Sequence, residues 1–176
     1  IGDARIYDSK QKGRPKRSQS GFLGMEVQER FPHLALETEK RLDNERIRDH
    51  FLTKLYTFAR FRKAREMGRP LDLLNFHTKH KFLLMAYNQE LMRRSGRILS
   101  DLKHTDLEKA FEDYRSMLDA AMKRGVSYTS HINVLMHCFG YVSKDLDKKE
   151  RNLFLDSVEM FREDRICLLY TSPSPR

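Results

Sequence analysis

Apolar residues recur every three or four positions along most of this chain, from residue 43 to residue 161. This spacing matches the 3.6-residue period of an α-helix, in which such residues share one face. No pair of alternating segments indicates a β-hairpin, and no internal repeat is visible. The sequence therefore predicts an all-α fold, a compact bundle of about six helices.

Capping residues predict where these helices begin and end. Asp43 or Asn44 can start the first long helix, and Gly68 followed by Pro70 can end it. Thr105 with Glu108, and Asp147 with Glu150, have the spacing of a capping box. The predicted core helices cover residues 43–68, 71–87, 89–102, 105–125, 128–146 and 147–161, and a short one over 21–31 stops before Pro32.

Two of these helices have distinctive apolar faces. The segment 71–87 is apolar on much of its circumference, which is typical of a central helix covered on several sides. In the segment 128–146 we expect Leu135, Cys138 and Val142 to face inward.

The two ends of the chain differ in composition from this helical middle. Residues 10–20 mix basic residues with Gly, Pro and Ser, which indicates an irregular basic N-terminal extension. The chain opens on Ile1 rather than Met, and residues 167–176 resemble a translated sequencing adapter, which we expect to be an artefact. The expected organisation is an extension and linker over 1–44, a helical domain over 45–166 that is truncated at its C-terminus, and the adapter-like tail.

Charge and cysteine content limit the classes of partner. The net charge is +9 and the isoelectric point about 9.6, which favours binding to polyanions, with nucleic acid as the first candidate. Outside the tail, Cys138 is the only cysteine, so a disulfide framework is excluded and we expect a cytoplasmic protein. No apolar run approaches the roughly 20 residues of a membrane span, so we expect no membrane partner.

A first polar cluster interrupts the apolar segment 71–87. His77 and Lys81 are four residues apart, and His80 lies one turn from His77, so the three can share one edge of the helix. Such an edge can bind phosphate or a base. Alternatively, the two imidazoles cap or bridge neighbouring helices while the lysine reaches water.

A second polar stripe follows the helix over 128–146. It consists of Asn133, His137, Tyr141 and Lys144, at i, i+4, i+8 and i+11. Amide, imidazole and phenol groups offer the hydrogen bonds and the ring face through which proteins bind looped RNA. If the two helices are neighbours, both clusters line one RNA-binding surface.

Other kinds of site have weaker support in the residues. His77 and His80 with His131 or His137 could supply zinc ligands, but neither a cysteine pair nor a His-Glu-x-x-His helix accompanies them. Neither a nucleophile elbow nor a phosphate-binding glycine loop is present. We therefore predict no catalytic, cofactor or metal-binding residue in this chain.

Two longer motifs carry a family resemblance. FHTKHKFLLMAYN at 76–88 and HINVLMHCFGYVSKDL at 131–146 resemble the YbgA-like family of bacterial helical domains, domain of unknown function 1722, and the similarity covers about residues 48–165. The residues that match the family pattern are His77, His80, Lys81, Asn133, His137, Gly140 and Tyr141.

The preceding segments have a resemblance of their own. ARIYD at 4–8, GFLGMEV at 21–27 and EKRLDNERIRDHF at 39–51 are similar to the end of a thiouracil or tRNA 4-thiouridine desulfidase-like domain, domain of unknown function 523. The resemblance implies a tRNA-binding module fused to an upstream catalytic domain whose cysteines hold an iron–sulfur cluster, with no desulfidase activity in this fragment. Two alternatives stay open: a small-molecule or metal-dependent activity around His77, His80, Asn133 and His137, and an interaction scaffold.

Overall fold

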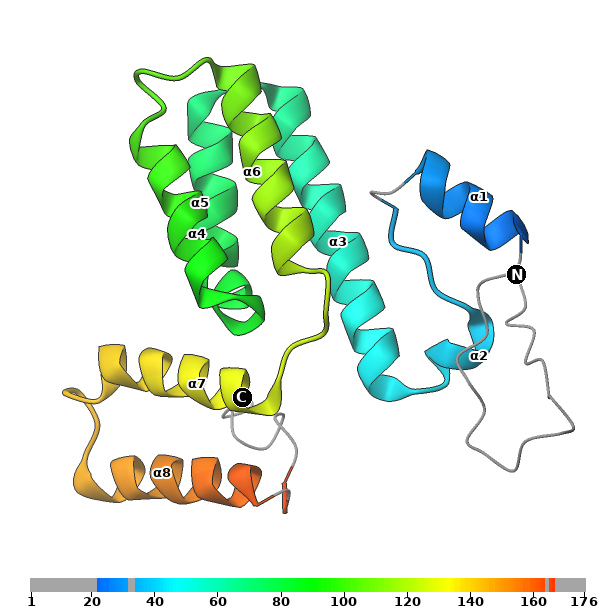
Figure 1. Ribbon diagram of the computed structural model, residues 1–176. Coiled ribbons are helices and arrows are strands. Elements are labelled where there is room, and N and C mark those ends of the chain that lie inside the picture. The colour runs from blue at the N-terminus through cyan, green and yellow to red at the C-terminus, as the bar shows by residue number, and fades with distance from the viewer. Residues whose placement is uncertain (1–21, 32–33, 164, 167–176) are drawn as a thin grey trace, which may run out of the picture. The chain divides into compact units, whose positions relative to one another are not determined.

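A computed structural model describes residues 22–31, 34–163 and 165–166 of the chain. Every regular element in these ranges is a helix, which confirms the predicted all-α fold (Figure 1). The basic stretch at 10–20 and the adapter-like tail lie outside the described residues. The chain divides after Glu66 into two compact units, which are described separately.

The first unit contains α1 (Phe22–Arg30), α2 (Glu39–Leu42) and nearly all of α3 (Glu45–Met67). The predicted short helix is confirmed as α1. Asn44 starts α3, since its side-chain oxygen accepts a hydrogen bond from the Ile47 amide at 3.2 Å. Gly68 follows the helix with a φ of 64°, the left-handed conformation that commonly ends helices. Both ends of α3 therefore agree with the prediction.

The second unit contains α4 (Pro70–Tyr87), α5 (Gln89–Ser100), α6 (Leu107–Ala121), α7 (Tyr128–Val142) and α8 (Lys148–Arg162). α4 packs against α5, α6 and α7, which confirms its predicted central position. α5 also packs against α6, and α7 packs against α8 (Figure 1). The largest side chains of the core come from α4 and α6 and include Leu73, Leu84, Phe111, Tyr114 and Leu118.

Ring contacts join α7 to α8 along their length. Phe139 and Phe154 stack with ring centroids 4.5 Å apart, and Tyr128 stacks on Phe161 at the same distance. At the start of α8, Asp147 and Glu150 form the predicted capping box, in which each side chain accepts from the other residue's amide. The two helices thus form an antiparallel hairpin with an aromatic seam.

Three details of the predicted helices are wrong. The helix predicted over 128–146 ends at Val142, so Lys144 lies in the turn after it. Asp106, not Thr105, caps α6, because its carboxylate accepts from the Lys109 amide at 3.2 Å while the Thr105 hydroxyl donates to Asp101. Val142 was expected to face inward but is 48% exposed, because α7 ends there and its contacts with α8 come from other residues. Leu135 and Cys138 are half-buried.

The described helices include none with the length and apolar character that crossing a lipid bilayer requires.

Candidate nucleic-acid interface

His77 lies in the interior of the second unit. Its Nδ1 atom is 2.9 Å from the hydroxyl of Tyr114 on α6, and the two rings meet edge to face. Its Nε2 atom faces Gly96 on α5, where an added Cβ would lie 3.8 Å away. Burial, together with the nearby Lys81 ammonium, lowers the pKa of His77. A neutral imidazole therefore links α4 to α6 beside α5.

The phenol that contacts His77 is fully enclosed. Burial raises the pKa of Tyr114, so the phenol keeps its proton and can donate it to Nδ1. In that arrangement, Nε2 of His77 carries the imidazole proton. The pair is a structural hydrogen bond within the core.

His80 is also buried, one turn further along α4. Its Nδ1–H donates to the Phe76 carbonyl at 2.7 Å, and its ring stacks on Phe76 with centroids 4.2 Å apart. Both histidines of the first polar cluster thus point into the core. His77 bridges α4 and α6, whereas His80 contacts Phe76 on its own helix. Lys81, by contrast, is exposed.

The contact between α4 and α7 joins the two helices that carry most of the remaining predicted residues. Phe82 on α4 meets Tyr141 on α7 with ring centroids 6.1 Å apart and an interplanar angle of 78°. The neighbouring positions of these two helices, assumed from the sequence, are therefore confirmed. We call the exposed residues around this contact the α4–α7 surface: Lys81, Phe82, Asn133, His137, Tyr141 and Lys144.

Sequence reasoning did not identify Phe82 as part of this surface. A phenylalanine in a segment that is apolar on most sides looks like any other core residue, and only its position next to Lys81 set it apart. The structure leaves Phe82 38% exposed and in contact with Tyr141.

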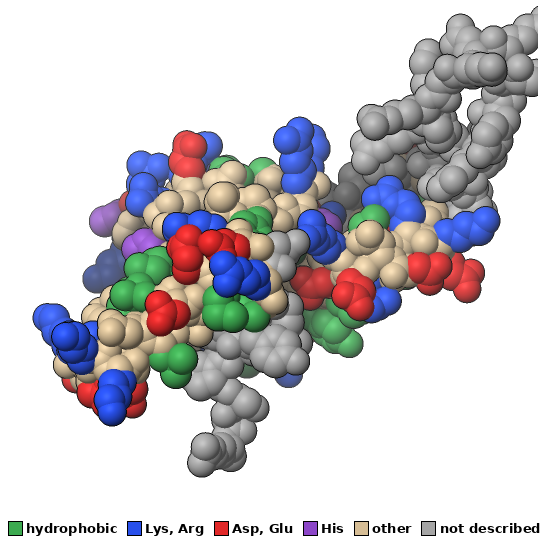
Figure 2. Space-filling model, turned by 90° about the horizontal axis from the view of Figure 1, so that it is seen from below, with side chains coloured by type: hydrophobic (Ala, Val, Ile, Leu, Met, Phe, Trp, Pro, Cys, Tyr) green, Lys and Arg blue, Asp and Glu red, His purple; other side chains and the backbone are tan. Residues whose placement is uncertain are grey.

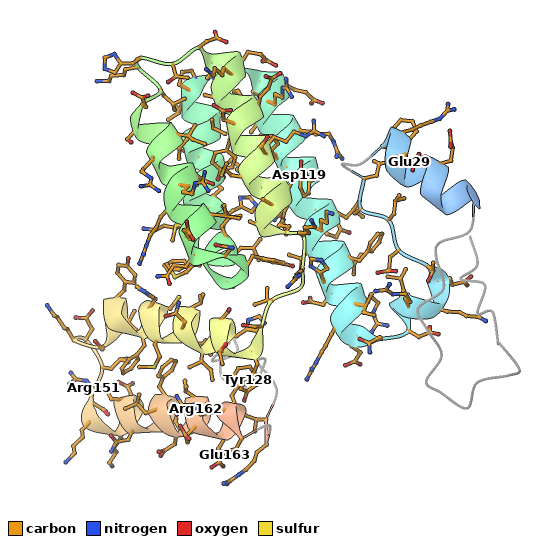
Figure 3. All side chains as sticks on the ribbon, in the orientation of Figure 1. Glu29, Asp119, Tyr128, Arg151, Arg162 and Glu163 are labelled. Atoms are coloured by element: carbon orange, nitrogen blue, oxygen red, sulfur yellow. The ribbon has the colours of Figure 1, made fainter. Side chains whose placement is uncertain are left out.

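A second unanticipated residue, Arg151, braces the turn between α7 and α8. Its Nε donates to the Leu146 carbonyl at 3.0 Å, and Nη2 donates to the Lys144 carbonyl at 3.5 Å (Figure 3). These hydrogen bonds hold the backbone that carries Lys144, one of the cations of the α4–α7 surface.

Metal and cofactor sites have little support in the described ranges. No group of three His, Cys, Asp or Glu side chains there could hold a metal ion. An iron–sulfur cluster typically needs four cysteine thiolates, whereas the sequence has two cysteines. Cys138 is half-buried, and burial raises its thiol pKa. The residues of this chain therefore do not fit such a cluster.

Comparison with known proteins adds a family assignment. The profile of the family described as "Protein of unknown function (DUF1722)" matches residues 81–171. The chain is also similar to the "Uncharacterized protein YbgA" of Escherichia coli strain K12, with 24% identity over 127 residues that cover 71% of this chain and 75% of that protein. No solved structure matches the chain.

Proposed function

The chain belongs to the family described as "Protein of unknown function (DUF1722)", and we propose that its helical domain is a tRNA-binding module. The observation that carries the proposal is the Phe82–Tyr141 contact, which unites the exposed end of α4 with the polar stripe of α7. On that surface, lysines can neutralise phosphates, while Asn133 and His137 can hydrogen-bond to base edges or 2′-hydroxyls. The net charge of +9 would draw RNA toward the domain.

The proposal assigns catalysis to a second, fused domain and tRNA binding to the helical domain. The resemblance of the segments at 4–8, 21–27 and 39–51 to the end of a 4-thiouridine desulfidase-like domain supports a fused catalytic domain, which would hold the iron–sulfur cluster and remove sulfur from tRNA. The cysteines of this chain do not supply the ligands for that chemistry. The helical domain would present the tRNA, and we expect the protein in the cytoplasm, where tRNA is used.

Salt dependence of tRNA binding tests this function. We expect the affinity of the purified protein for fluorescently labelled tRNA, measured by anisotropy, to fall steeply between about 50 and 200 mM salt as counterions are released. Lys81→Ala and Lys144→Ala should each weaken binding several-fold and reduce the slope of log affinity against log salt by about one. His137→Ala should also weaken binding, without unfolding the protein.

Lys109→Ala provides a matched control, because Lys109 is an exposed lysine on α6 outside the α4–α7 surface. Equal losses in this control and in Lys81→Ala would mean that binding follows total charge and not this surface. A folded protein that binds no tRNA, or binds it independently of salt, would contradict the proposal.

An independent small-molecule or metal-dependent activity has less structural support. Of the four residues considered for it, His77 and His80 are buried and hydrogen-bonded within the core. Elemental analysis of the purified protein separates the two functions, since stoichiometric zinc or iron would favour this second one.

A further inference from the structure

The Phe82–Tyr141 pair differs from the ring pairs of the core because both of its rings reach solvent. Tyr141 is 67% exposed and Phe82 38% exposed, whereas Phe76 and Tyr114 in the core are 4% and 0% exposed. An edge-to-face contact uses the edge of one ring and one face of the other, so the pair keeps ring faces free. Aromatic faces held open by two packed helices need no rearrangement before a planar ligand stacks on them.

Lysines flank this pair in the sequence, one on α4 and one in the turn after α7. Lys81 precedes Phe82 in sequence, and Lys144 follows Tyr141 by three residues. Arg151 lies against the same turn through its hydrogen bond to the Lys144 carbonyl. Figure 2 shows basic side chains, with acidic ones among them, at the end of the hairpin where α7 meets α8.

The acidic residues at this end of the hairpin lie in the turn and at the start of α8. Asp147 and Glu150 accept hydrogen bonds from each other's backbone amides, so their carboxylates are committed to the start of α8. Asp145 is exposed in the turn beside Lys144. In the described residues, neither Lys81 nor Lys144 forms an ion pair, so both ammonium groups are open to an anionic partner.

We propose that the Tyr141 ring, held edge to face by Phe82, is a stacking platform for an unpaired nucleobase, with Lys81 and Lys144 binding the adjacent phosphates. Open ring faces beside cations are what single-stranded nucleic acid requires, since every base has a π-face and every linkage a negative charge. A base inside a duplex cannot reach the rings, because both of its faces are already stacked. This inference rests on the proposed RNA-binding function and narrows its ligand to looped or single-stranded segments.

The test uses a short single-stranded RNA that carries one 2-aminopurine, whose fluorescence falls when it stacks on an aromatic ring. We expect quenching with the wild-type protein, and weak binding of the same oligonucleotide in a duplex. Tyr141→Ala should weaken single-strand binding about ten-fold or more and abolish quenching. Tyr141→Phe keeps the ring and should behave like wild type, while Phe82→Ala should give a smaller loss.

The outcomes separate this inference from the proposed function. If Tyr141→Ala and Phe82→Ala keep the quenching and the affinity while Lys81→Ala loses affinity, the platform is wrong and the RNA-binding surface stands. Equal wild-type affinity for single strand and duplex would also overturn the platform. If the folded wild-type protein binds neither the single-stranded oligonucleotide nor tRNA, both proposals fail. Circular dichroism of each variant checks that the fold is retained.

Discussion

The helices α6 and α7 have the same length, 15 residues, but opposite patterns of burial. α6 carries acidic and basic residues and buries five side chains, whereas α7 has no Asp, Glu, Lys or Arg and buries none completely. The apolar residues of α6 lie on one stripe that faces α4 and α5, while those of α7 are distributed around a helix that packs on α4 and α8. Arrangement of apolar residues, not their amount, decides which helix joins the core.

The largest expected difference between the two helices is in the cost of removing a large apolar side chain. Leu118→Ala on α6 should lower the free energy of unfolding by about 2–5 kcal/mol, because Leu118 is 1% exposed and its loss leaves a cavity. Met136→Ala on α7 should cost less than about 1 kcal/mol, because Met136 is already 41% exposed. Urea unfolding of both variants measures the difference, and similar costs would break the comparison.

Removing a tyrosine hydroxyl compares the two helices through the loss of a single atom from each. Tyr114→Phe on α6 should destabilise the protein by about 1–3 kcal/mol, because Nδ1 of His77 loses its partner in the core. Tyr141→Phe on α7 should change stability by less than about 0.5 kcal/mol, because that residue is mostly exposed. A neutral Tyr114→Phe would mean that His77 finds another partner.

The N-caps should show no such difference between the helices. Asp106 and Ser127 each accept a hydrogen bond from a backbone amide three residues ahead, so Asp106→Ala and Ser127→Ala should each cost about 1 kcal/mol. Thr105→Ala is the control and should cost less than about 0.5 kcal/mol, because the Thr105 hydroxyl bonds to the Asp101 side chain in an exposed turn and not to an amide of α6. Thermal unfolding would measure these differences. A larger loss for Thr105→Ala than for Asp106→Ala would restore the original capping prediction.

The smallest expected effect is the dependence of stability on pH through His77. Its pKa in the folded protein lies below the reference value of 6.5, so the unfolded chain binds a proton more readily. The contribution of neutral His77 to the free energy of unfolding is therefore complete above pH 6.5. It is lost as the pH falls toward the pKa of His77 in the folded protein. Urea unfolding between about pH 7 and 5 should show a shallower decline for His77→Asn than for wild type. Equal declines in the two proteins would show that His77 does not cause the loss of stability at low pH.

The sequence predicted helices more reliably than it predicted surfaces. The Asp147–Glu150 capping box, the Asn44 cap and Gly68 are local signals, and the structure confirms each of them. Thr105 and Asp106 are adjacent and both suit a cap, so the choice depended on the turn before α6. Local pattern cannot resolve such a choice.

The sequence predicted the burial of the candidate site residues less well on α4 than on α7. In α4, apolar residues lie on nearly all sides, so nothing in the sequence said which face carries His77 and His80 inward and which carries Lys81 and Phe82 outward. On α7 the polar stripe was regular, and Asn133, His137 and Tyr141 are exposed as a stripe should be, while Lys144 lies exposed in the turn after the helix. Whether these residues bind RNA stays a prediction for the binding experiments.

The hydrogen bonds of Arg151 limit how the α7–α8 hairpin can move. By bonding to the carbonyls of Lys144 and Leu146, a side chain of α8 closes a small ring over the turn. Any displacement of α8 must then either carry the backbone of Lys144 and Leu146 with it or break that hydrogen-bonded ring. The turn that presents Lys144 to a ligand would in this way move together with a helix that the ligand does not touch.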